Sequence, residues 1–529
     1  LTVMMDSPFF YLDNGNHNWN GSTWISTASY DYYGTNLMYM RSNSDTNVYF
    51  SDSSVTALGV SDSGDNQGFS LGRLYNPMDL VMNNTTISGL AVIYGSMAYK
   101  YTWSSTNHHT LEEFQVTNST FTHFRGYRDG TSLNYEDSCI AMTGGDGAVI
   151  ADNNFDNCMI GVLMDLSPYS YSHSRSEYGS DNLTISGNTF VNGGEVADIY
   201  GDPNNNVDGL VVSGNTMNPT NSGSGIAIQS GSAKDMVISD NTINNAADGI
   251  YLRSVMNFTI DDNTISGVSD ASATGILVYG GSGDVTDNTL VDADGGLYLY
   301  QMESPPSPTS ALCEISSNEY SRQTSCSWTL AAGKEAAFNL GTDSWGYEIS
   351  ITVTLPNGTT DSWPTYTFGS NTNYNPLTTY TAPGNYTLTV SDSWGDGGAT
   401  ITVLESTSGS TGYAGPSITG NTIGVSPGRS APNAQGLVML DCDGINIQSG
   451  MNNVKLTDNA MVIENCDVTD TGSILVGTDT ASTNGIFGDD SNSALSLNGT
   501  DISGFSTGVI KEGGVLNMFG DADITGVDY

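Results

Sequence analysis

The sequence feature that constrains the fold most is a short phrase that recurs between residues 183 and 300. It reads LTISGNTF, LVVSGNTM, MVISDNTI, FTIDDNTI and DVTDNTL, and it returns every 22 to 27 residues. The Asn that precedes Thr in successive phrases is Asn188, Asn215, Asn241, Asn263 and Asn288. A repeat of this length without helical spacing indicates a solenoid in which each repeat forms one coil.

Each coil is predicted to consist of short β-strands joined by tight turns. Apolar and small polar residues alternate within the phrase, which is the period of a strand. The Asn-Thr segment favours a bend because Asn tolerates the left-handed region and its amide bonds locally. Further apolar runs begin at Gly225, Gly249, Gly275 and Gly296. Stacking places equal positions about 4.8 Å apart, so apolar side chains fill the bore and the Asn amides form a hydrogen-bonded ladder.

The phrase resembles the repeat of right-handed parallel β-helix proteins of the pectate-lyase-like superfamily. The resemblance runs from about Phe114 to the end and implies an all-β solenoid in two parts, residues 111–303 and 413–529. That superfamily includes polysaccharide lyases, glycoside hydrolases, phage tailspikes, adhesins and surface-layer proteins. The resemblance therefore implies a fold and leaves the activity open.

Residues 1–110 show no clean repeat, and we expect an N-terminal cap of irregular β structure. Aromatic residues are dense here, among them Trp19, Trp24, Tyr30, Tyr32, Tyr33, Tyr39 and Tyr49. A cap would cover the strand edges of the first coil. The alternative interpretation is an aromatic face that binds sugars.

Residues 304–412 are predicted to form an inserted antiparallel β-sandwich. A linker, Ser304-Pro-Pro-Ser-Pro, interrupts the repeat, which resumes at Ser417-Ile-Thr-Gly-Asn-Thr-Ile. Between them lie strictly alternating runs that begin at Glu348, Tyr386 and Ala399 and are separated by Pro and Gly turns. Strict alternation with such turns is typical of a small sandwich.

The insert resembles small calcium-associated sandwich modules of secreted microbial proteins, through GNYTLTVSDSWGDG from Gly384 and a shorter echo at Asp343. The resemblance implies a calcium site at Asp343, Asp392 and Asp396, since hard cations take carboxylate oxygens. The alternative is an ordinary Asp-Gly hairpin turn. A weaker calcium candidate has alternating oxygen ligands but lacks the distant Glu of a helix-loop-helix site. It consists of Asp202, Asn204, Asn206 and Asp208.

The six cysteines fall into three local pairs, Cys139/Cys158, Cys313/Cys326 and Cys442/Cys466. Fifteen pairings are formally possible. The first and third pairs are separated by 19 and 24 residues, close to one coil, so their members reach equivalent places on adjacent coils at a spacing that a disulfide permits. We expect three disulfides and an oxidising, extracellular setting.

Composition excludes some partners. The formal net charge is −44, with 13 Lys and Arg against 57 Asp and Glu. Nucleic acid is therefore not expected as a partner, whereas multivalent cations are expected to bind. No apolar run has the length of a membrane span, and the absence of an initiating Met suggests a processed or trimmed chain. Nine sequons are candidate glycosylation sites of an exported protein. They are Asn20, Asn83, Asn84, Asn118, Asn182, Asn257, Asn357, Asn385 and Asn498.

Two function classes remain. A polysaccharide lyase needs a basic residue beside the sugar, but Lys234, Arg253 and Lys455 are scattered singly. A glycoside hydrolase needs two nearby carboxylates, which Asp248 and Asp261/Asp262 could supply, but such pairs arise readily by chance in so acidic a chain. The sequence therefore favours an extracellular structural or adhesive surface protein over an enzyme. The last coils show no evident polar cap, which means that a partner covers them or the natural protein continues. We expect self-association into a filament, sheath or array, with glycans as further partners.

Overall fold

The computed structural model describes the chain outside a set of segments of uncertain placement. Those segments are residues 6–14, 27–45, 58–68, 72–77, 89–92, 96–110, 123–137, 143–146, 157, 159, 166–181, 193–194, 201–206, 219–225, 232, 247, 268–273, 293–294, 303–310, 316–322, 332–333, 343–345, 370–371, 393–398, 408–416, 425–434, 443–444, 457–458, 478–483, 489–492, 521 and 526–529. The chain forms two units, Leu1–Ser304 with Gly415–Tyr529, and Pro305–Ala414.

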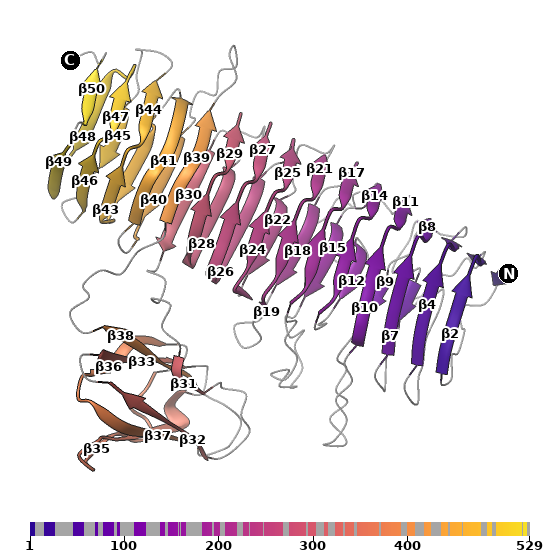
Figure 1. Cartoon of the computed structure of the whole chain (residues 1–529), viewed down its shortest axis with the longest axis horizontal. Helices are drawn as coiled ribbons and strands as arrows, with labels where there is room; N and C mark the ends of the chain where they lie inside the picture. Colours follow the sequence, from indigo (N-terminus) through magenta and orange to yellow (C-terminus); the bar gives the residue numbers. More distant parts are fainter. Residues whose placement is uncertain are drawn as a thin grey trace. The chain divides into compact units, whose positions relative to one another are not determined.

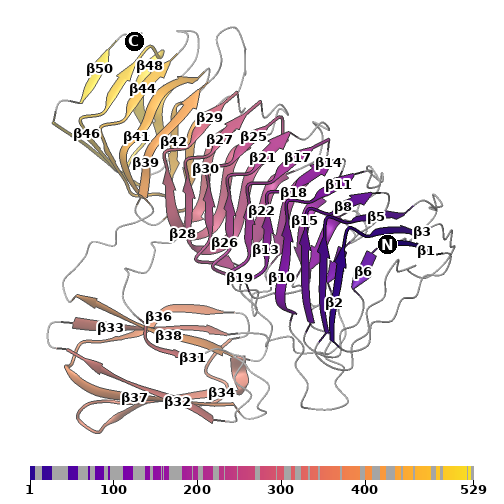
Figure 2. The same cartoon turned by 45° about the vertical axis from the view of Figure 1, so that its right-hand side comes forward.

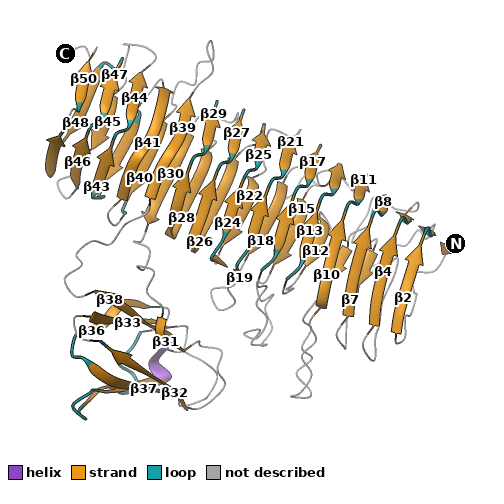
Figure 3. Ribbon diagram, viewed as in Figure 1, coloured by secondary structure: helices purple, strands orange, loops and turns teal. Residues whose placement is uncertain are grey.

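The first unit is a parallel β-helix whose coils follow one another along a single axis from the N-terminus to the C-terminus (Figure 1). Forty-two described strands pair side by side into one continuous parallel sheet. A view turned by 45° shows that the sheet wraps around the bore, so that the described strands lie on three faces (Figure 2). Figure 3 shows that strands and short turns make up almost all of the described chain.

The first face consists of β1 (Thr2–Met5), β3 (Thr23–Ser26), β5 (Ser54–Ala57), β8 (Thr86–Ser88), β11 (Thr120–Thr122), β14 (Asn154–Asp156), β17 (Thr189–Val191), β21 (Thr216–Asn218), β25 (Thr242–Asn244), β27 (Thr264–Ser266), β29 (Thr289–Val291), β44 (Ile474–Gly477), β47 (Asp501–Ser503) and β50 (Asp523–Thr525). The second face consists of β2 (Gly15–Asn20), β4 (Thr46–Ser51), β7 (Met78–Asn83), β10 (Leu111–Thr117), β13 (Val149–Ala151), β16 (Thr184–Ser186), β20 (Val211–Ser213), β24 (Val237–Ser239), β43 (Val468–Thr471), β46 (Ala494–Asn498) and β49 (Val515–Phe519).

The third face consists of β6 (Phe69–Leu71), β9 (Ile93–Gly95), β12 (Ser138–Met142), β15 (Ile160–Asp165), β18 (Glu195–Tyr200), β22 (Ile226–Gly231), β30 (Gly295–Met302), β40 (Gln435–Leu440), β42 (Met461–Glu464), β45 (Asn484–Gly488) and β48 (Thr507–Lys511). Longer strands bend across two faces, namely β26 (Asp248–Asp261), β28 (Thr274–Thr286), β39 (Ser417–Gly424) and β41 (Ile445–Leu456). Two short strands, β19 (Val207–Asp208) and β23 (Ala233–Lys234), lie between the third and second faces.

The corner between the second and first faces carries the predicted ladder, which the structure confirms. Each Asn side chain is buried, and the Nδ2 of one Asn donates to the Oδ1 of the Asn in the next coil. The distance is 3.0 Å from Asn188 to Asn215 and from Asn215 to Asn241, and 2.9 Å from Asn241 to Asn263. The residue before each Asn has a positive φ, as in Gly187, Gly214 and Asp240, which is why Gly, Asp and Asn occupy this place.

The same ladder continues in the coils after the insert and in the N-terminal part of the β-helix. Asn288 donates to Asn421, 133 residues further along, at 3.0 Å, so the β-helix resumes in register after the insert. In the other direction Ser119 N donates to Asn153 Oδ1 at 2.8 Å. Ser22 and Ser53 occupy the ladder position in the earliest coils, with their hydroxyls 2.9 Å apart.

The expectation that residues 1–110 form an irregular cap is wrong for the part of this region that is described. Strands β2, β4, β7 and β10 pair in parallel, one after another, as later coils do. Trp24 is buried in the bore, and Trp19 packs on Trp24 and Phe50 with ring centroids 4.8 Å and 4.7 Å apart, so these aromatic residues are core rather than a sugar-binding face. The remaining tyrosines of the cluster except Tyr49 lie outside the described residues.

The second unit is the predicted sandwich of two antiparallel sheets. One sheet orders β31 (Ala311–Ile315), β38 (Ala399–Thr407), β33 (Lys334–Thr342) and β36 (Asn373–Tyr380). The other orders β32 (Gln323–Leu330), β37 (Gly384–Asp392), β34 (Ile349–Thr354) and β35 (Thr360–Trp363), and a 3-10 turn, η2 (Gly346–Glu348), precedes β34. The buried core between the sheets includes Phe338 of the first sheet and Leu388 of the second.

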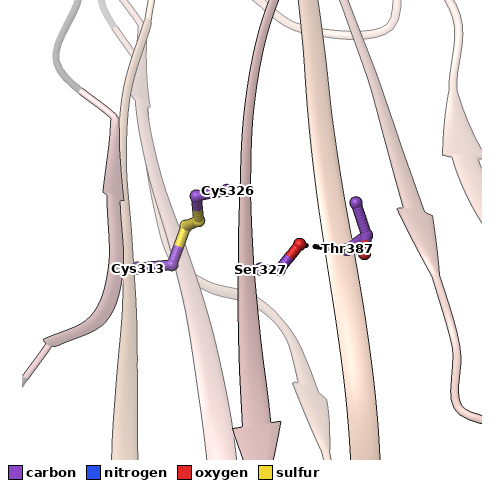
Figure 4. The surroundings of a disulfide bond; sticks show 4 residues. All are labelled: Cys313, Cys326, Ser327 and Thr387. Carbon is purple, nitrogen blue, oxygen red and sulfur yellow. Dashed lines mark hydrogen bonds between the residues drawn. A yellow bond between two sulfur atoms is a disulfide. The ribbon is translucent and has the colours of Figure 1, made fainter.

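Disulfides occur at two of the three predicted pairs. Cys139–Cys158 joins two successive third-face coils, and Cys313–Cys326 joins β31 to β32, thereby linking the two sheets of the sandwich (Figure 4). In the same view the hydroxyl of Ser327 on β32 forms a hydrogen bond of 3.0 Å with the hydroxyl of Thr387 on β37.

The predicted disulfide between Cys442 and Cys466 is wrong, because both residues are free and buried thiols. They occupy a second ladder. Cys442 N donates to Cys466 Sγ at 3.1 Å, and Cys466 N donates to Ser493 Oγ at 3.0 Å. Each sulfur thus takes the place that an Asn oxygen fills in the first ladder. Hydrogen bonding to Cys442 and burial raise the pKa of the Cys466 thiol, which keeps it protonated.

Candidate functional site

A group of tyrosines on the outside of the third face is the most distinctive described surface of the β-helix. Along β26, β28 and β30 the residues alternate, so that Ile250 and Leu252 enter the bore while Tyr251 and Arg253 point outward. The register places Arg253 beside Tyr279 and Tyr279 beside Tyr300 on successive coils. Figure 1 shows these strands as adjacent rungs. Residues far apart in sequence therefore meet because the coil repeats.

Three of these tyrosine rings, those of Tyr279, Tyr298 and Tyr300, are in contact with one another. The rings of Tyr279 and Tyr300 are stacked, with centroids 6.2 Å apart and an interplanar angle of 28°. Tyr298 meets Tyr300 edge-on, also at 6.2 Å, and its hydroxyl donates to Gln435 Oε1 at 3.0 Å. We call Tyr251, Arg253, Tyr279, Tyr298 and Tyr300 the tyrosine face.

The exposure and charge of the tyrosine face suit a neutral or weakly polar ligand. Tyr279 is 40% exposed, and Arg253 is also exposed. Burial raises the pKa of the Tyr300 phenol above its ordinary value of 10.0, so it is a neutral hydrogen-bond group at physiological pH. Tyrosines provide large, rigid, amphipathic contact area, and Arg supplies several fixed donors. This combination fits a ligand with both apolar faces and hydroxyl groups.

The two carboxylates described within the third-face parts of the strands from β26 to β42 are too far apart for glycoside hydrolysis. Within these parts of the strands, the described acidic side chains are Asp248 and Glu464. Asp248 already accepts a hydrogen bond from Thr274 N at 2.7 Å. The two acids are separated by four coil steps, or about 19 Å at the usual strand spacing, whereas hydrolases hold their two carboxyls about 5 to 9.5 Å apart.

The other candidate acid and base residues do not complete a catalytic site. Asp248 and Asp261 lie at opposite ends of β26, on different faces of the coil, so they do not form the pair considered from sequence. Lys234 Nζ lies 4.0 Å from Asp208 Oδ2 and 3.8 Å from Asp235 Oδ2. The side chain of Lys455 lies outside the described residues.

An acidic line follows the ladder corner. Asp240, Asp262 and Asp287 occupy the same left-handed position on successive coils. Repulsion from Asp261, with smaller contributions that include Asp287 and Asp240, raises the pKa of the exposed Asp262 carboxyl. Across the described residues, however, no group of three or more His, Cys, Asp or Glu side chains is arranged to hold a metal ion.

The predicted calcium residues mostly lie outside the described part of the chain. Asp343, Asp396, Asp202, Asn204 and Asn206 belong to the segments whose placement is uncertain. Asp392 is the last residue of β37, in register with Ile349, and its side chain is not described. Asp208 lies on β19 near Lys234. The calcium sites remain predictions.

Of the residues in the tyrosine face, the sequence pattern identifies Arg253 as a candidate and none of the tyrosines. The runs Gly249-Ile-Tyr-Leu and Gly296-Leu-Tyr-Leu did contain a signal, since each places Tyr at an outward position between two bore residues. The contact of Tyr279 with Tyr300 depends on coil register, which the sequence pattern alone does not display. No helix of the described chain has the length and apolar character to cross a membrane.

Comparison with known proteins supports the fold. Residues 138–306 match a family model described as a right handed beta helix region. A search among curated proteins finds no match. Among solved structures, the tailspike protein of E. coli bacteriophage HK620, studied as a mutant in complex with a pentasaccharide, is 12% identical over 76% of this chain and 86% of that chain, with a TM-score of 0.29.

Two further solved structures are similarly distant. The tailspike protein of Acinetobacter baumannii phage AM24 is 10% identical over 76% of each chain, with a TM-score of 0.26. A PL6-family alginate lyase is 10% identical over 99% of this chain and 81% of that chain, with a TM-score of 0.21. At such scores these likenesses carry no argument about activity. The family match and the strand pairing show that this chain is a right-handed parallel β-helix protein with an inserted antiparallel β-sandwich.

Proposed function

We propose that this protein binds glycans outside the cell through the tyrosine face of its β-helix. The observation that supports this proposal is the stacked pair Tyr279 and Tyr300, flanked by Arg253 on the preceding coil. Exposed aromatic side chains on a rigid sheet are a common way to bind a ligand that is apolar on one side and polar at its edges. Disulfides such as Cys139–Cys158 support an oxidising, extracellular setting.

The glycan is proposed to be neutral. With a net charge of −44, the protein repels polyanionic chains at long range, and a single exposed Arg253 on the tyrosine face does not offset that field. The coil-to-coil spacing of about 4.8 Å presents the rings as a row, which suits an extended polysaccharide. The wide separation of Asp248 and Glu464 favours binding over hydrolysis.

Affinity measurements with truncated tyrosines test the proposal. Purified protein is screened against neutral and acidic polysaccharides, and the best ligand is titrated calorimetrically against wild type, Tyr279→Ala and Tyr300→Ala. Loss of one ring should weaken binding about tenfold, which corresponds to ~1.4 kcal/mol. Tyr366→Ala is the matched control, because Tyr366 is 81% exposed but belongs to the insert.

Several results would contradict the proposal. Equal affinity of the tyrosine-face variants and the control would exclude this face as the binding site. Preferential binding of acidic glycans would show that the charge reasoning is wrong. Release of shortened or unsaturated oligosaccharides during the screen would show that the protein is an enzyme that cleaves the glycan.

A second candidate function is a structural role in a surface array, filament or sheath. It is favoured by the exposed apolar side chains of β49, where Val515 and Phe519 are 51% and 56% exposed. Contiguous apolar surface of this kind often marks a protein contact. Self-association and glycan binding are compatible, because β49 belongs to the second face and the tyrosine face to the third.

A further inference from the structure

The hairpin between β34 and β35 presents one of the nine sequons at its tip. The turn is Leu355-Pro-Asn-Gly-Thr, in which Leu355 N donates to Thr359 O at 2.8 Å and Gly358 N donates to Leu355 O at 2.9 Å. Gly358 has a φ of 83°, which few other residues adopt without strain. All of these hydrogen bonds lie within five residues. The turn is therefore local and does not require the rest of the fold to form.

The Asn357 side chain is held by its own sequon. Its Oδ1 accepts hydrogen bonds from Thr359 N at 2.9 Å and from Thr359 Oγ1 at 2.7 Å. These two bonds occupy the oxygen, whereas the Nδ2 has no hydrogen-bond partner among the described residues. Asn357, Gly358 and Thr359 are all exposed. Both elements that a glycosylating enzyme must reach, the Asn nitrogen and the Thr hydroxyl, are thus on the surface.

Three of the other sequons have their hydroxyl inside the β-helix. Asn20, Asn83 and Asn498 are paired with Ser22, Thr85 and Thr500, which are only 2%, 1% and 1% exposed. Thr500 Oγ1, for example, donates to Asp470 Oδ2 at 2.5 Å in the interior. Once a coil has formed, such a hydroxyl is not accessible.

Three further sequons have their Asn nitrogen engaged by a neighbouring coil. Asn84 Nδ2 donates to Asp52 Oδ1 at 2.6 Å, and Asn118 Nδ2 donates to Asn83 Oδ1 at 2.9 Å. Asn257 Nδ2 donates to Asp235 Oδ1. These amides sit at corner positions with positive φ, where the coil fixes them.

The last two sequons are held by backbone pairing. Asn182 lies at a coil corner, with a φ of 61°, and its N–H donates to Asp208 O at 2.7 Å. Asn385 lies within β37, in register with Thr329, whose hydroxyl donates to its Oδ1 at 2.7 Å. Neither has the free, locally formed turn that surrounds Asn357.

We propose that Asn357 is the principal N-glycan attachment site of this protein. In that modification Asn357 Nδ2 bonds to the anomeric carbon of an oligosaccharide carried on a lipid diphosphate. The bond from that carbon to the diphosphate oxygen breaks, the lipid diphosphate leaves, and Nδ2 loses one proton. The site is separate from the tyrosine face and does not depend on the glycan-binding proposal.

Mapping of glycopeptides from the full chain, secreted by a host that performs N-glycosylation, tests the site. No Lys or Arg lies between Lys334 and Arg429, so chymotrypsin is used to separate the Asn357 peptide from the Asn385 peptide. We expect a glycopeptide that contains Asn357, conversion of this Asn to Asp by peptide N-glycosidase, and loss of the modification in both Asn357→Gln and Thr359→Ala. Asn498→Gln is the matched control, and its intact mass should change only by the substitution.

The proposal is overturned if Asn357 is unmodified, whether or not another sequon carries a glycan. It is also overturned if Asn357→Gln leaves most of the attached carbohydrate in place. Folding of the insert in Asn357→Gln and Thr359→Ala is checked independently by recovery of the Cys313–Cys326 peptide without reduction, because that disulfide forms between the two sheets of the insert.

Discussion

Individual polar residues inside the bore explain how a narrow solenoid turns its corners. In the Asn ladder, Asn263 Nδ2 donates both to Ile238 O and to Asn288 Oδ1, each at 2.9 Å, and its Oδ1 accepts from Asn241 N at 3.1 Å. The buried amide therefore satisfies backbone groups that the bend would leave unpaired. An unpaired buried group costs about 1 to 3 kcal/mol, so the ladder removes a penalty in every coil.

Among the described buried residues, Asp470 is exceptional because it places a carboxyl in the bore. It is fully buried, and its oxygens accept hydrogen bonds from Ser473 Oγ and Thr500 Oγ1, both at 2.5 Å. Burial raises the pKa of this carboxyl above 3.8, although the hydrogen bonds oppose the increase. The folded protein consequently retains this proton at pH values at which the unfolded chain has lost it.

The first prediction concerns the pH dependence that Asp470 causes. As pH rises above 3.8, the unfolded carboxyl ionises first, so the stability contributed by this group is complete below that pH and is lost as pH rises through the folded-state pKa. Asp470→Asn should increase the free energy of unfolding at pH 7 by about 1.4 kcal/mol for each unit by which folding raises the pKa. The difference in unfolding free energy between Asp470→Asn and wild type should vanish near pH 3.8.

Urea unfolding at a series of pH values measures this difference, and Asp501→Asn, at an exposed position, is the control. A variant that is less stable than wild type at pH 7 would show that the ionised carboxylate stabilises the coil.

The glycine row is the element that lets the third face approach the first. A Cβ built on Gly249 would lie 2.3 Å from Gly275 O, and one on Gly296 would lie 2.3 Å from Gly436 O. Real Cβ atoms are not found at such distances from a backbone oxygen. Gly249 and Gly296 are therefore required by the neighbouring coil, not by the φ of the residue itself.

The second prediction compares two glycines of this row. Gly296→Ala should lower the free energy of unfolding by about 1 to 3 kcal/mol, since backbone oxygen leaves no room for the methyl group. Gly275→Ala should cost less, because its Cβ would lie 3.0 Å from Gly296 O. Urea midpoints of the two variants test the order, and an equal or larger loss in Gly275→Ala would be inconsistent with steric crowding as the cause.

The inserted sandwich is a separate element with its own core. Trp328 stacks on Tyr386 with centroids 5.1 Å apart, and Tyr386 Oη donates to Ala382 O at 2.7 Å. A Tyr that bonds back to the backbone a few residues earlier is a known corner device of sandwiches. The insert is therefore expected to unfold as its own cooperative unit.

The third prediction is that calcium stabilises this unit. If Asp343, Asp392 and Asp396 supply oxygen ligands, added calcium should raise the melting temperature of the insert, and Asp396→Asn should remove that response. Calorimetry of the full chain with calcium and with a chelator measures it. Asp361→Asn, outside this group of residues, should leave the calcium response intact, and a calcium-independent melt of the wild type would exclude the site.

At the scale of the whole molecule, solenoid stability is a sum of coil contributions and contacts between adjacent coils. The strand β49 makes such a contact with β46. Leu516 and Met518 continue the rows of the buried Leu495 and Leu497, yet they are 41% and 44% exposed. Inward-facing apolar side chains that remain exposed favour association.

The fourth prediction is self-association through this surface. Light scattering should give a mass above the 55.8 kDa of one chain, and Leu516→Asp with Met518→Asp should return the protein to that mass. Ile474→Asp, at an exposed position on β44, is the control and should not change the mass. A wild-type protein that remains monomeric over a wide concentration range would exclude association through β49.

Local patterns in the sequence predict the solenoid, the Asn ladder from Asn188 to Asn288 and the inserted sandwich, because strand period and turn chemistry are properties of neighbouring residues. They miss the early coils for a physical reason. Their repeats are 31 to 35 residues long, and Ser22, Ser53 and Ser119 replace Asn in the ladder. Longer repeats and a shorter polar side chain conceal the phrase, although the same corner forms.

Contacts between residues that are distant in the sequence depend on the three-dimensional fold. The sequence spacing of Cys442 and Cys466 is compatible with a disulfide, but in the fold both are free thiols, and Cys466 Sγ accepts a hydrogen bond from Cys442 N. Tyr279 and Tyr300 are neighbours because coil length and register align them. The coils also bury the hydroxyl or engage the amide of six sequons other than that of Asn357. Such relations depend on contacts between coils or between sheets, and a sequence pattern that is read along one chain direction does not contain them.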